Sequence, residues 1–254
     1  MADISEEEML AELRAISNKS SNSRFAGIEK KVVSTKMYNA PDGGSKENSE
    51  VGGVAGNVGS NGDAFLLGNP EDTDLNQYWY SKNTIEALTN ECESLIKKNG
   101  KTFKIAFLST PSIYFALSDE SRKQCYVFDY DKKWDNDRGF VFYDFNEPLE
   151  FDKELLKIFD LIVIDPPFIT RAVWEQYTVS AKALLKSSPT YNNNTGRIIG
   201  TTVQENAPFM EELLACKAQK FKPSIPNLVY QYNSYANFED VDFLGKVNPE
   251  ILED

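Results

Sequence analysis

From Leu75 onward, short apolar runs alternate with amphipathic stretches. The apolar runs have the length of strands and stand at residues 104–109, 124–128, 140–143, 161–164 and 197–200. The amphipathic stretches predict helices at residues 82–98, 110–118, 171–186 and 205–217. Strands that alternate with helices predict an α/β fold with a doubly wound, mostly parallel sheet. Residues 227–243 are expected to add a C-terminal antiparallel hairpin.

The first of these helices carries start and stop signals. Ser81 is a suitable N-cap, and Asn99-Gly100 ends the periodic pattern. Between them, apolar residues fall on one helical face, at Ile85, Leu88, Cys92, Leu95 and Ile96. The aromatic cluster Tyr78-Trp79-Tyr80 precedes the cap. It fits two interpretations equally well, either a hydrophobic staple or a cover over a cofactor or a substrate amine.

We predict two parts in the chain, an N-terminal extension at residues 1–74 and the main domain at residues 75–254. The extension begins with a helix from Ser5 to about Ile16, with an apolar stripe at Met9, Leu10, Leu13 and Ile16. An accessory helix on the domain, or a fraying arm, is favoured over a partner-binding helix. Residues 17–69 are rich in Ser, Asn and Gly, so they bury too little apolar area to offset their ordering entropy. They are predicted to form a largely disordered linker.

The most informative stretch begins with the apolar run 161–164. A continuous apolar run is typical of a strand covered on both faces, and ligands of open α/β sheets bind outside the carboxyl ends of such strands. Asp165-Pro166-Pro167-Phe168 comes directly after the run. A carboxylate and a proline-held carbonyl are both acceptors that can hold an NH₂ group, and an aromatic ring can stack beside it. The alternative without a catalytic role is an Asp-Pro turn after a strand.

Composition narrows the chemistry. The chain carries 39 Asp and Glu against 27 Lys and Arg, a net charge of −12, with no basic cluster. This balance argues against tight, stable binding to nucleic acid phosphates. The sequence contains no His, which excludes His general bases, His metal ligands and Ser–His or Cys–His triads. We therefore expect no metal.

The cysteines, the N-terminal stretch and the length of the apolar runs suggest a cytoplasmic protein. Cys92, Cys125 and Cys216 are widely spaced and form neither a disulfide framework nor a CxxC pair. Three scattered cysteines fit a reducing compartment. The acidic N-terminal stretch shows no secretory signal, and no apolar run is long enough to cross a membrane.

Two further carboxylates come directly after neighbouring predicted strands. Asp129 stands 20 residues after Ser109, close to the spacing at which Rossmann-like folds place the acid that holds a ribose. Asp144 ends the next strand and could accept an adenine amine. Ser109-Thr110-Pro111-Ser112 replaces the glycine-rich turn, which counts against a dinucleotide but less against S-adenosylmethionine, a ligand without phosphate. Either acid taken alone is more simply a solvated strand-end carboxylate.

Taken together, these residues resemble a specific family, the eukaryotic lysine methyltransferases of translation elongation factor one-alpha, formerly grouped as adenine-specific DNA methyltransferases. The resemblance spans Leu75 to about Phe243. It rests on six stretches in the same order: Gln77 to Ser81, Ser109 to Tyr114, Phe128 to Lys132, Phe142 to Asn146, Asp165 to Phe168 and, more loosely, Asn227-Leu228 with Tyr232 and Tyr235. The sequence departs from the family at Val229-Tyr230-Gln231, where an Asn-Glu-Phe-Arg-like run is expected.

The resemblance implies a Rossmann-like class I methyltransferase fold, S-adenosylmethionine as cofactor and a protein substrate, elongation factor one-alpha. It also implies two groups of site residues. The catalytic group is Asp165, Pro166, Pro167 and Phe168. The cofactor-binding group is Trp79, Tyr80, Ser109, Thr110, Asp129, Tyr130, Asp144 and Phe145. We expect a monomer that does not associate with membranes.

Two other functions remain open. An adenine methyltransferase acting on nucleic acid is compatible with the Asp165-Pro166-Pro167-Phe168 tip, because the exocyclic amine of adenine is also planar and stackable. A binding protein that has kept the fold and lost catalysis is the other alternative.

Overall fold

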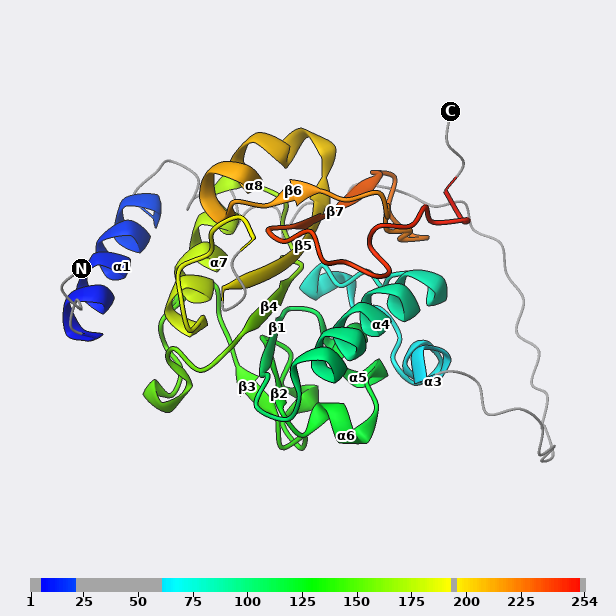
Figure 1. Cartoon of the computed structure of the whole chain (residues 1–254), viewed down its shortest axis with the longest axis horizontal. Coiled ribbons are helices and arrows are strands. Elements are labelled where there is room, and N and C mark those ends of the chain that lie inside the picture. Colours follow the sequence, from blue (N-terminus) through cyan, green and yellow to red (C-terminus); the bar gives the residue numbers. More distant parts are fainter. Residues whose placement is uncertain (1–5, 22–60, 193–195, 252–254) are drawn as a thin grey trace.

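The computed structural model describes residues 6–21, 61–192 and 196–251, and within them seven strands form one sheet (Figure 1). The strands are β1 (Ile105–Leu108), β2 (Cys125–Asp129), β3 (Phe140–Phe142), β4 (Leu161–Ile164), β5 (Arg197–Val203), β6 (Lys217–Ala218) and β7 (Tyr232–Ala236). Their order is β3-β2-β1-β4-β5-β7-β6. The first five strands in this order pair in parallel, and β7 is antiparallel to both β5 and β6. The predicted Rossmann-like sheet with C-terminal antiparallel strands is confirmed.

Helices cover both faces of the sheet. They are α1 (Glu6–Ser21), α3 (Asn61–Gly68), α4 (Lys82–Asn99), α5 (Pro111–Ala116), α6 (Asp119–Arg122), α7 (Arg171–Leu184) and α8 (Ala207–Leu214). Ile105 and Phe107 of β1 pack in the core under α3, α4 and α5. Ala106 and Leu108, which point to the other face, pack in the core under α7 and α8. Figure 1 shows the resulting three layers.

Helix α4 has the predicted ends. The Ser81 hydroxyl accepts the Thr84 N–H at 3.2 Å, and Gly100 ends the helix at φ 83°, a region that glycine enters without a steric penalty. The five apolar residues predicted for its inner face are all buried. The capping residues and the apolar spacing together therefore explain where α4 starts and which face it buries.

Two predicted helices are shorter than expected. The helix predicted at 110–118 breaks after Ala116, because Leu117 and Ser118 are extended and the Ser118 side chain caps the separate helix α6. Helix α8 ends at Leu214, since Ala215 takes a left-handed φ of 56°. The chain is thereby released to form β6. Of the two strands in the antiparallel pair, only β7 lies within the predicted range 227–243.

Helix α1 lies against the outer side of α7 (Figure 1). Leu10 and Leu13 are buried there, and the Ser17 hydroxyl donates to Gln176 Oε1 at 2.8 Å. Ile16, predicted to belong to the apolar stripe, is instead 47% exposed. The docked position agrees with an accessory helix on the domain.

Part of the segment predicted as linker is helical. Helix α3 inserts Phe65 into an aromatic cluster, with ring centroids 5.1 Å from Trp79 and 5.8 Å from Trp134. One large buried ring offsets the polar composition that suggested a linker. Residues 22–60 of that segment lie outside the described residues, and the domain boundary at residue 75 stays a prediction.

Candidate functional site

The parallel register brings four polar residues to one edge of the sheet. Three of them are predicted from the sequence, and the fourth is found from the structure. Leu108 pairs with Phe128 on one side and with Ile164 on the other, and Ile164 pairs with Gly200. The next residues along these strands are Ser109, Asp129, Asp165 and Thr201. The carboxyl ends of β2, β1, β4 and β5 therefore present a continuous row of side chains.

Asp165 stands in the middle of this row and is half-buried. Its backbone N–H donates to the Leu108 carbonyl at 3.2 Å, which ties the tip of β4 to β1. The Tyr80 hydroxyl donates to Asp165 Oδ2 at 2.5 Å and lies 2.6 Å from Thr201 Oγ1. Tyr80 enters from the segment before α4, so three distant parts of the chain meet at this carboxylate.

Burial changes the acid–base properties of this group. Loss of hydration raises the pKa of Asp165 to about 7, although the nearby hydroxyl groups of Tyr80 and Thr201 oppose the rise. The pKa of Tyr80 is well above its ordinary value because of burial and then because of the nearby Asp165 charge. Burial followed by the same charge raises the pKa of Tyr232, the first residue of β7. The carboxyl group can thus change protonation state near neutral pH while the tyrosines stay neutral.

The segment 76–80, which we call the strap, contacts the residues that follow β4 and β2. At one end, Asn76 donates through its side-chain amide to the Pro167 carbonyl. Gln77 donates to Asp131 Oδ2 at 3.1 Å, beyond the end of β2. Tyr80 reaches Asp165 at the other end. Asn76 adopts a left-handed φ of 55°, which Asn tolerates better than most residues, and this turn directs the strap over the β4 tip.

Ser109 and Thr110 leave β1 in a sharp turn. Ser109 has φ 55°, and its hydroxyl lies 2.6 Å from the Tyr177 hydroxyl of α7. Thr110 is 2% exposed and makes no side-chain cap to α5. Within the described part of the chain, its Oγ1 has no hydrogen-bond partner. A buried hydroxyl without a partner is costly, so a polar ligand group at this turn would be favoured.

Asp129 ends β2 and is 6% exposed. Burial raises its pKa to about 7, and the Asp131 N–H, which donates to Oδ1 at 2.9 Å, acts in the opposite direction. Tyr130 comes next, with a ring that is 55% exposed and lies 5.5 Å from the Phe142 ring. A desolvated acid beside an exposed ring is a suitable pair for a ribose and a flat base.

Asp144 and Phe145 lie just beyond β3. Asp144 Oδ1 accepts the backbone N–H of Asn146 at 2.9 Å. The Phe145 ring packs at 6.2 Å against Phe168 of the β4 tip and at 6.1 Å against Tyr177. Phe145 therefore connects the β3 end with the predicted catalytic tetrapeptide.

Trp79 is buried and packs against helix α3 and the residue that follows it. Its indole N–H donates to the Asn69 carbonyl at 2.9 Å, and its ring contacts Phe65. These contacts fit the hydrophobic-staple interpretation of the aromatic cluster. The cofactor-binding role of Trp79 remains a prediction, which these contacts do not require.

Three residues at the site are absent from the sequence-based candidates: Thr201, Asn76 and Tyr177. Thr201 has a positional signal, because it lies within a buried strand at the same register as Asp165. Asn76 and Tyr177 carry none, since their roles depend on contacts made across 91 and 68 residues of chain.

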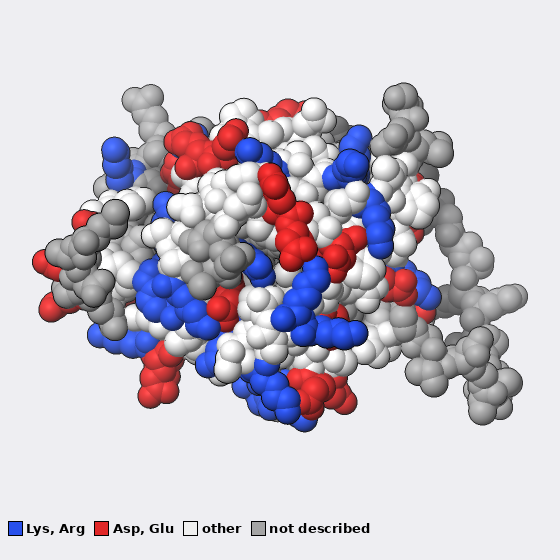
Figure 2. Space-filling view, viewed as in Figure 1, with Lys and Arg blue, Asp and Glu red and all other residues white. Residues whose placement is uncertain are grey.

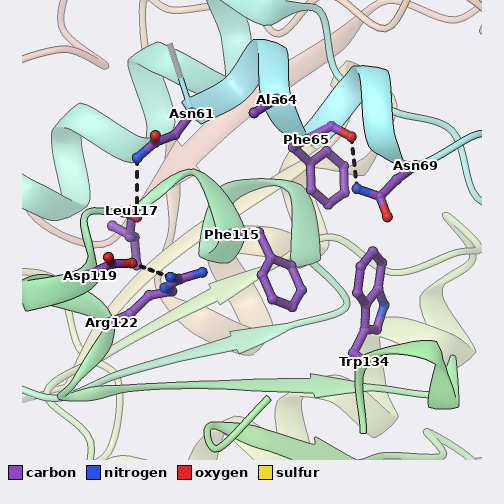
Figure 3. Close-up of a pocket in the computed structure, with 9 residues that line it drawn as sticks. All are labelled: Asn61, Ala64, Phe65, Asn69, Phe115, Leu117, Asp119, Arg122 and Trp134. Carbon is purple, nitrogen blue, oxygen red and sulfur yellow. Dashed lines mark hydrogen bonds and ion pairs between the residues drawn. The ribbon is translucent and has the colours of Figure 1, made fainter. Parts of the chain in front are cut away.

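A separate pocket of about 230 Å³ lies between α3, α5 and α6 (Figure 3). In Figure 3 the Phe65 ring points from α3 toward Phe115 and Trp134, with the Asp119–Arg122 ion pair at one end. None of the predicted site residues lines this pocket. It is a gap beside the aromatic cluster, not part of the row at the sheet edge.

Residues 6–21, 61–192 and 196–251 contain no group of three or more His, Cys, Asp and Glu side chains arranged to hold a metal ion. Over the same ranges, no helix combines the length and apolar character that a bilayer crossing requires. On the face shown in Figure 2, acidic and basic side chains are interspersed without a continuous basic surface.

The row of residues fits S-adenosylmethionine. Asp129 and Asp144 would hold the ribose and the adenine amine, Tyr130 and Phe145 would flank the base, and Ser109 with the unpartnered Thr110 hydroxyl would hold the amino-acid portion. The transferred methyl would then lie toward Asp165.

Known proteins provide independent comparisons. The family model described as "Probable N6-adenine methyltransferase" matches residues 71–240. Protein-lysine N-methyltransferase EFM5 of Saccharomyces cerevisiae is 29% identical over 183 residues, which are 66% of this chain and 73% of the yeast protein. Human EEF1A lysine methyltransferase 1 is 32% identical over 66% of this chain and 76% of its own length. The Danio rerio protein of the same name is 30% identical over 65% and 97%.

Proposed function

Because this chain belongs to the probable N6-adenine methyltransferase family and is 32% and 30% identical to the human and Danio rerio EEF1A lysine methyltransferases 1, we propose that it methylates a lysine side chain of a protein, with S-adenosylmethionine as methyl donor. The observation that carries the proposal is the position of Asp165. This carboxylate lies at the end of β4. Ser109 lies at the end of the neighbouring strand β1, and Asp129 lies at the end of β2, the strand after that. Amine acceptor and cofactor residues thereby share one edge of the sheet.

The proposed substrate is elongation factor one-alpha, which the names of the relatives specify for those relatives. The acidic balance of the chain, with net charge −12, favours a basic protein surface around the target lysine. We propose that the enzyme acts in the cytoplasm, as a monomer, without a metal and without stable nucleic acid or membrane binding.

The chain's own residues would prepare the amine. A lysine ammonium has an ordinary pKa near 10.4 and no lone pair, so it must lose a proton before it can attack. Buried surroundings favour the neutral amine. Asp165 would accept one N–H, and the Pro166 carbonyl, to which none of the described residues donates, would accept another. Phe168 would wall the pocket.

S-adenosylmethionine supplies a methyl group on a positively charged sulfur. Held between Asp165 and the Pro166 carbonyl, the neutral lysine nitrogen would present its lone pair to that methyl group. Asp165 and Pro166 set the direction of the lone pair, and most of the acceleration would come from this positioning.

The test offers labelled S-adenosylmethionine, purified elongation factor one-alpha and a nucleic acid pool to the wild type and to Asp165→Asn. We expect label in the protein with the wild type and at least a hundredfold less with Asp165→Asn, while calorimetry shows cofactor affinity within about threefold. Asp160→Asn is the matched control. Asp160 lies at the opposite end of β4, where it pairs with Lys186, so transfer should persist.

Each other outcome is informative. Label in nucleic acid would replace the lysine proposal by adenine methylation, as the description of the family model suggests. Cofactor binding without transfer to either substrate would indicate a binding protein. Equal transfer by wild type and Asp165→Asn would remove Asp165 from the mechanism.

A further inference from the structure

The Asp165 carboxylate is held by hydroxyl groups and not by a cation. Of the described residues, the titratable groups that face it are the phenols of Tyr80 from the strap, Tyr177 from α7 and Tyr232 from β7. No Lys or Arg of the described residues contributes to the shift in the pKa of Asp165. A carboxylate that has lost much of its hydration and has no cationic partner depends on hydrogen bonds to stay ionised.

The direction of these hydrogen bonds can be worked out from a count of protons. The Tyr80 hydroxyl has one proton, and it goes to Asp165 Oδ2 across 2.5 Å, because a carboxylate only accepts. The contact of 2.6 Å between Tyr80 and Thr201 must then be a donation from the Thr201 hydroxyl to the Tyr80 oxygen. The result is a chain of donors from Thr201 to Tyr80 to Asp165, in which each bond polarises the next.

Both donors are held rigidly. Thr201 is 2% exposed within β5, one residue beyond the Ile164–Gly200 pair. Tyr80 is 3% exposed, and its strap is anchored at the Pro167 carbonyl through Asn76. The strap therefore contacts the carboxylate and one proline carbonyl of the tip, and it leaves the Pro166 carbonyl free of described donors.

We propose that Tyr80 and Thr201 are positioning residues that hold the Asp165 carboxylate in one orientation and keep it ionised for the substrate amine. The inference rests on the proposed function, and it assigns to Tyr80 a different task from the cofactor contact predicted for it. The ring is almost fully buried and the hydroxyl is committed to Asp165, so Tyr80 acts on the reaction through the acid. Thr201 acts through Tyr80, because the single proton of its hydroxyl is donated to the Tyr80 oxygen.

The experiment is a pH–rate profile for wild type, Tyr80→Phe, Thr201→Val and the double variant. Removal of the Tyr80 hydroxyl leaves the effect of burial less opposed, so the carboxyl group of Asp165 keeps its proton to higher pH. The acidic limb of the Tyr80→Phe profile should move to higher pH, kcat at pH 7 should fall at least about tenfold, and much of the loss should be recovered at pH 9. Affinity for S-adenosylmethionine should stay within about threefold.

Tyr114→Phe is the matched control. Its hydroxyl also donates to an aspartate, Asp137 Oδ1 at 2.6 Å, outside the row of site residues, so the limb should not move. Thr201→Val should shift the limb less in the Tyr80→Phe background than in the wild type, since the two donors form one chain. A uniform loss of rate at every pH, or a wild-type profile in Tyr80→Phe, would overturn the inference.

A second measurement separates this inference from the proposed function. The Asp165 carboxyl carbon can be titrated by ¹³C NMR in the protein without substrate, with Asp165→Asn used to assign the signal. Tyr80→Phe should raise its titration midpoint even if no lysine substrate is found. An unchanged midpoint would contradict the inference while leaving methyl transfer untouched.

Discussion

Asp129 is a single side chain whose burial lowers the free energy of unfolding near neutral pH. Its carboxyl group is 6% exposed, and burial raises its pKa to about 7. The folded protein therefore holds a proton that the unfolded chain releases at lower pH. The free energy of unfolding accordingly falls as pH rises from about 4 to about 7, and this part of it is not recovered above that range.

Asp129→Asn should remove this pH dependence. At pH 8 we expect the variant to be more stable than the wild type, by up to roughly 4 kcal/mol if the whole shift is removed, and at pH 4 nearly equal to it. Urea unfolding at both pH values measures this difference. Binding of S-adenosylmethionine, measured by calorimetry, should weaken at least about tenfold, because an amide replaces the acid that would hold the ribose.

Exposed Asp135 offers a control nearby, and Asp135→Asn should change neither quantity appreciably. Unchanged cofactor affinity in Asp129→Asn would remove the ribose assignment. An unchanged difference in stability between pH 4 and pH 8 would mean that the site hydrates more than the structure indicates.

Among the elements, α4 depends on one buried acid to hold the C-terminal segment. Glu91 is fully buried, and its carboxylate accepts the backbone N–H groups of Asp242, Phe243 and Leu244 at 3.1, 2.7 and 3.0 Å. Three donors converge on one anion, which offsets the cost of its burial. Leu244 is in turn fully buried against the core under α4.

Glu91→Gln should be strongly destabilising. The amide offers one acceptor oxygen in place of two, and its NH₂ group faces backbone donors, so we expect a loss of about 2–4 kcal/mol in the free energy of unfolding. Glu86→Gln on the exposed side of the same helix should cost less than about 0.5 kcal/mol. Chemical denaturation of both variants measures the difference. Equal effects would show that the three N–H groups find other partners.

The elements also show what sequence patterns can and cannot predict. The parallel strands and their aligned ends can be inferred from buried runs and strand-end acids, so Ser109, Asp129 and Asp165 can be placed together in advance. The break at Leu117-Ser118 and the two-residue strand β6 are too short to produce a recognisable hydrophobic periodicity in the sequence. The Tyr80–Asp165 bond spans 85 residues, and no local pattern encodes such a contact.

At the scale of the whole molecule, α1 is attached to the domain through a small separate cluster. Leu10 and Leu13 pack with Leu156, Val179 and Ala183 in a cluster distinct from the two main cores. The described contacts of α1 are concentrated on α7. We therefore expect that this helix can loosen without a large effect on the candidate site.

Leu13→Ala should release α1 while transfer continues. Loss of a buried leucine weakens docking by roughly 2 kcal/mol or more, so hydrogen exchange in residues 6–21 should accelerate about thirtyfold. Ile16→Ala on the exposed side of the same helix should leave exchange nearly unchanged. A comparable drop in methyl transfer with Leu13→Ala would mean that α1 contributes to the site.

The strand order determines which strand edge the nascent chain exposes during synthesis. Strand β7 lies between β5 and β6, so residues near the C-terminal end complete a sheet whose other strands are made earlier. As translation proceeds, the seven-residue strand β5 emerges with one edge open and stays so until Tyr232–Ala236 has left the ribosome. A nascent chain that stalls between these strands would expose an unpaired strand edge that can pair with other chains. We expect chaperones and proteases to bind such a chain, and we do not expect it to be an active shorter enzyme.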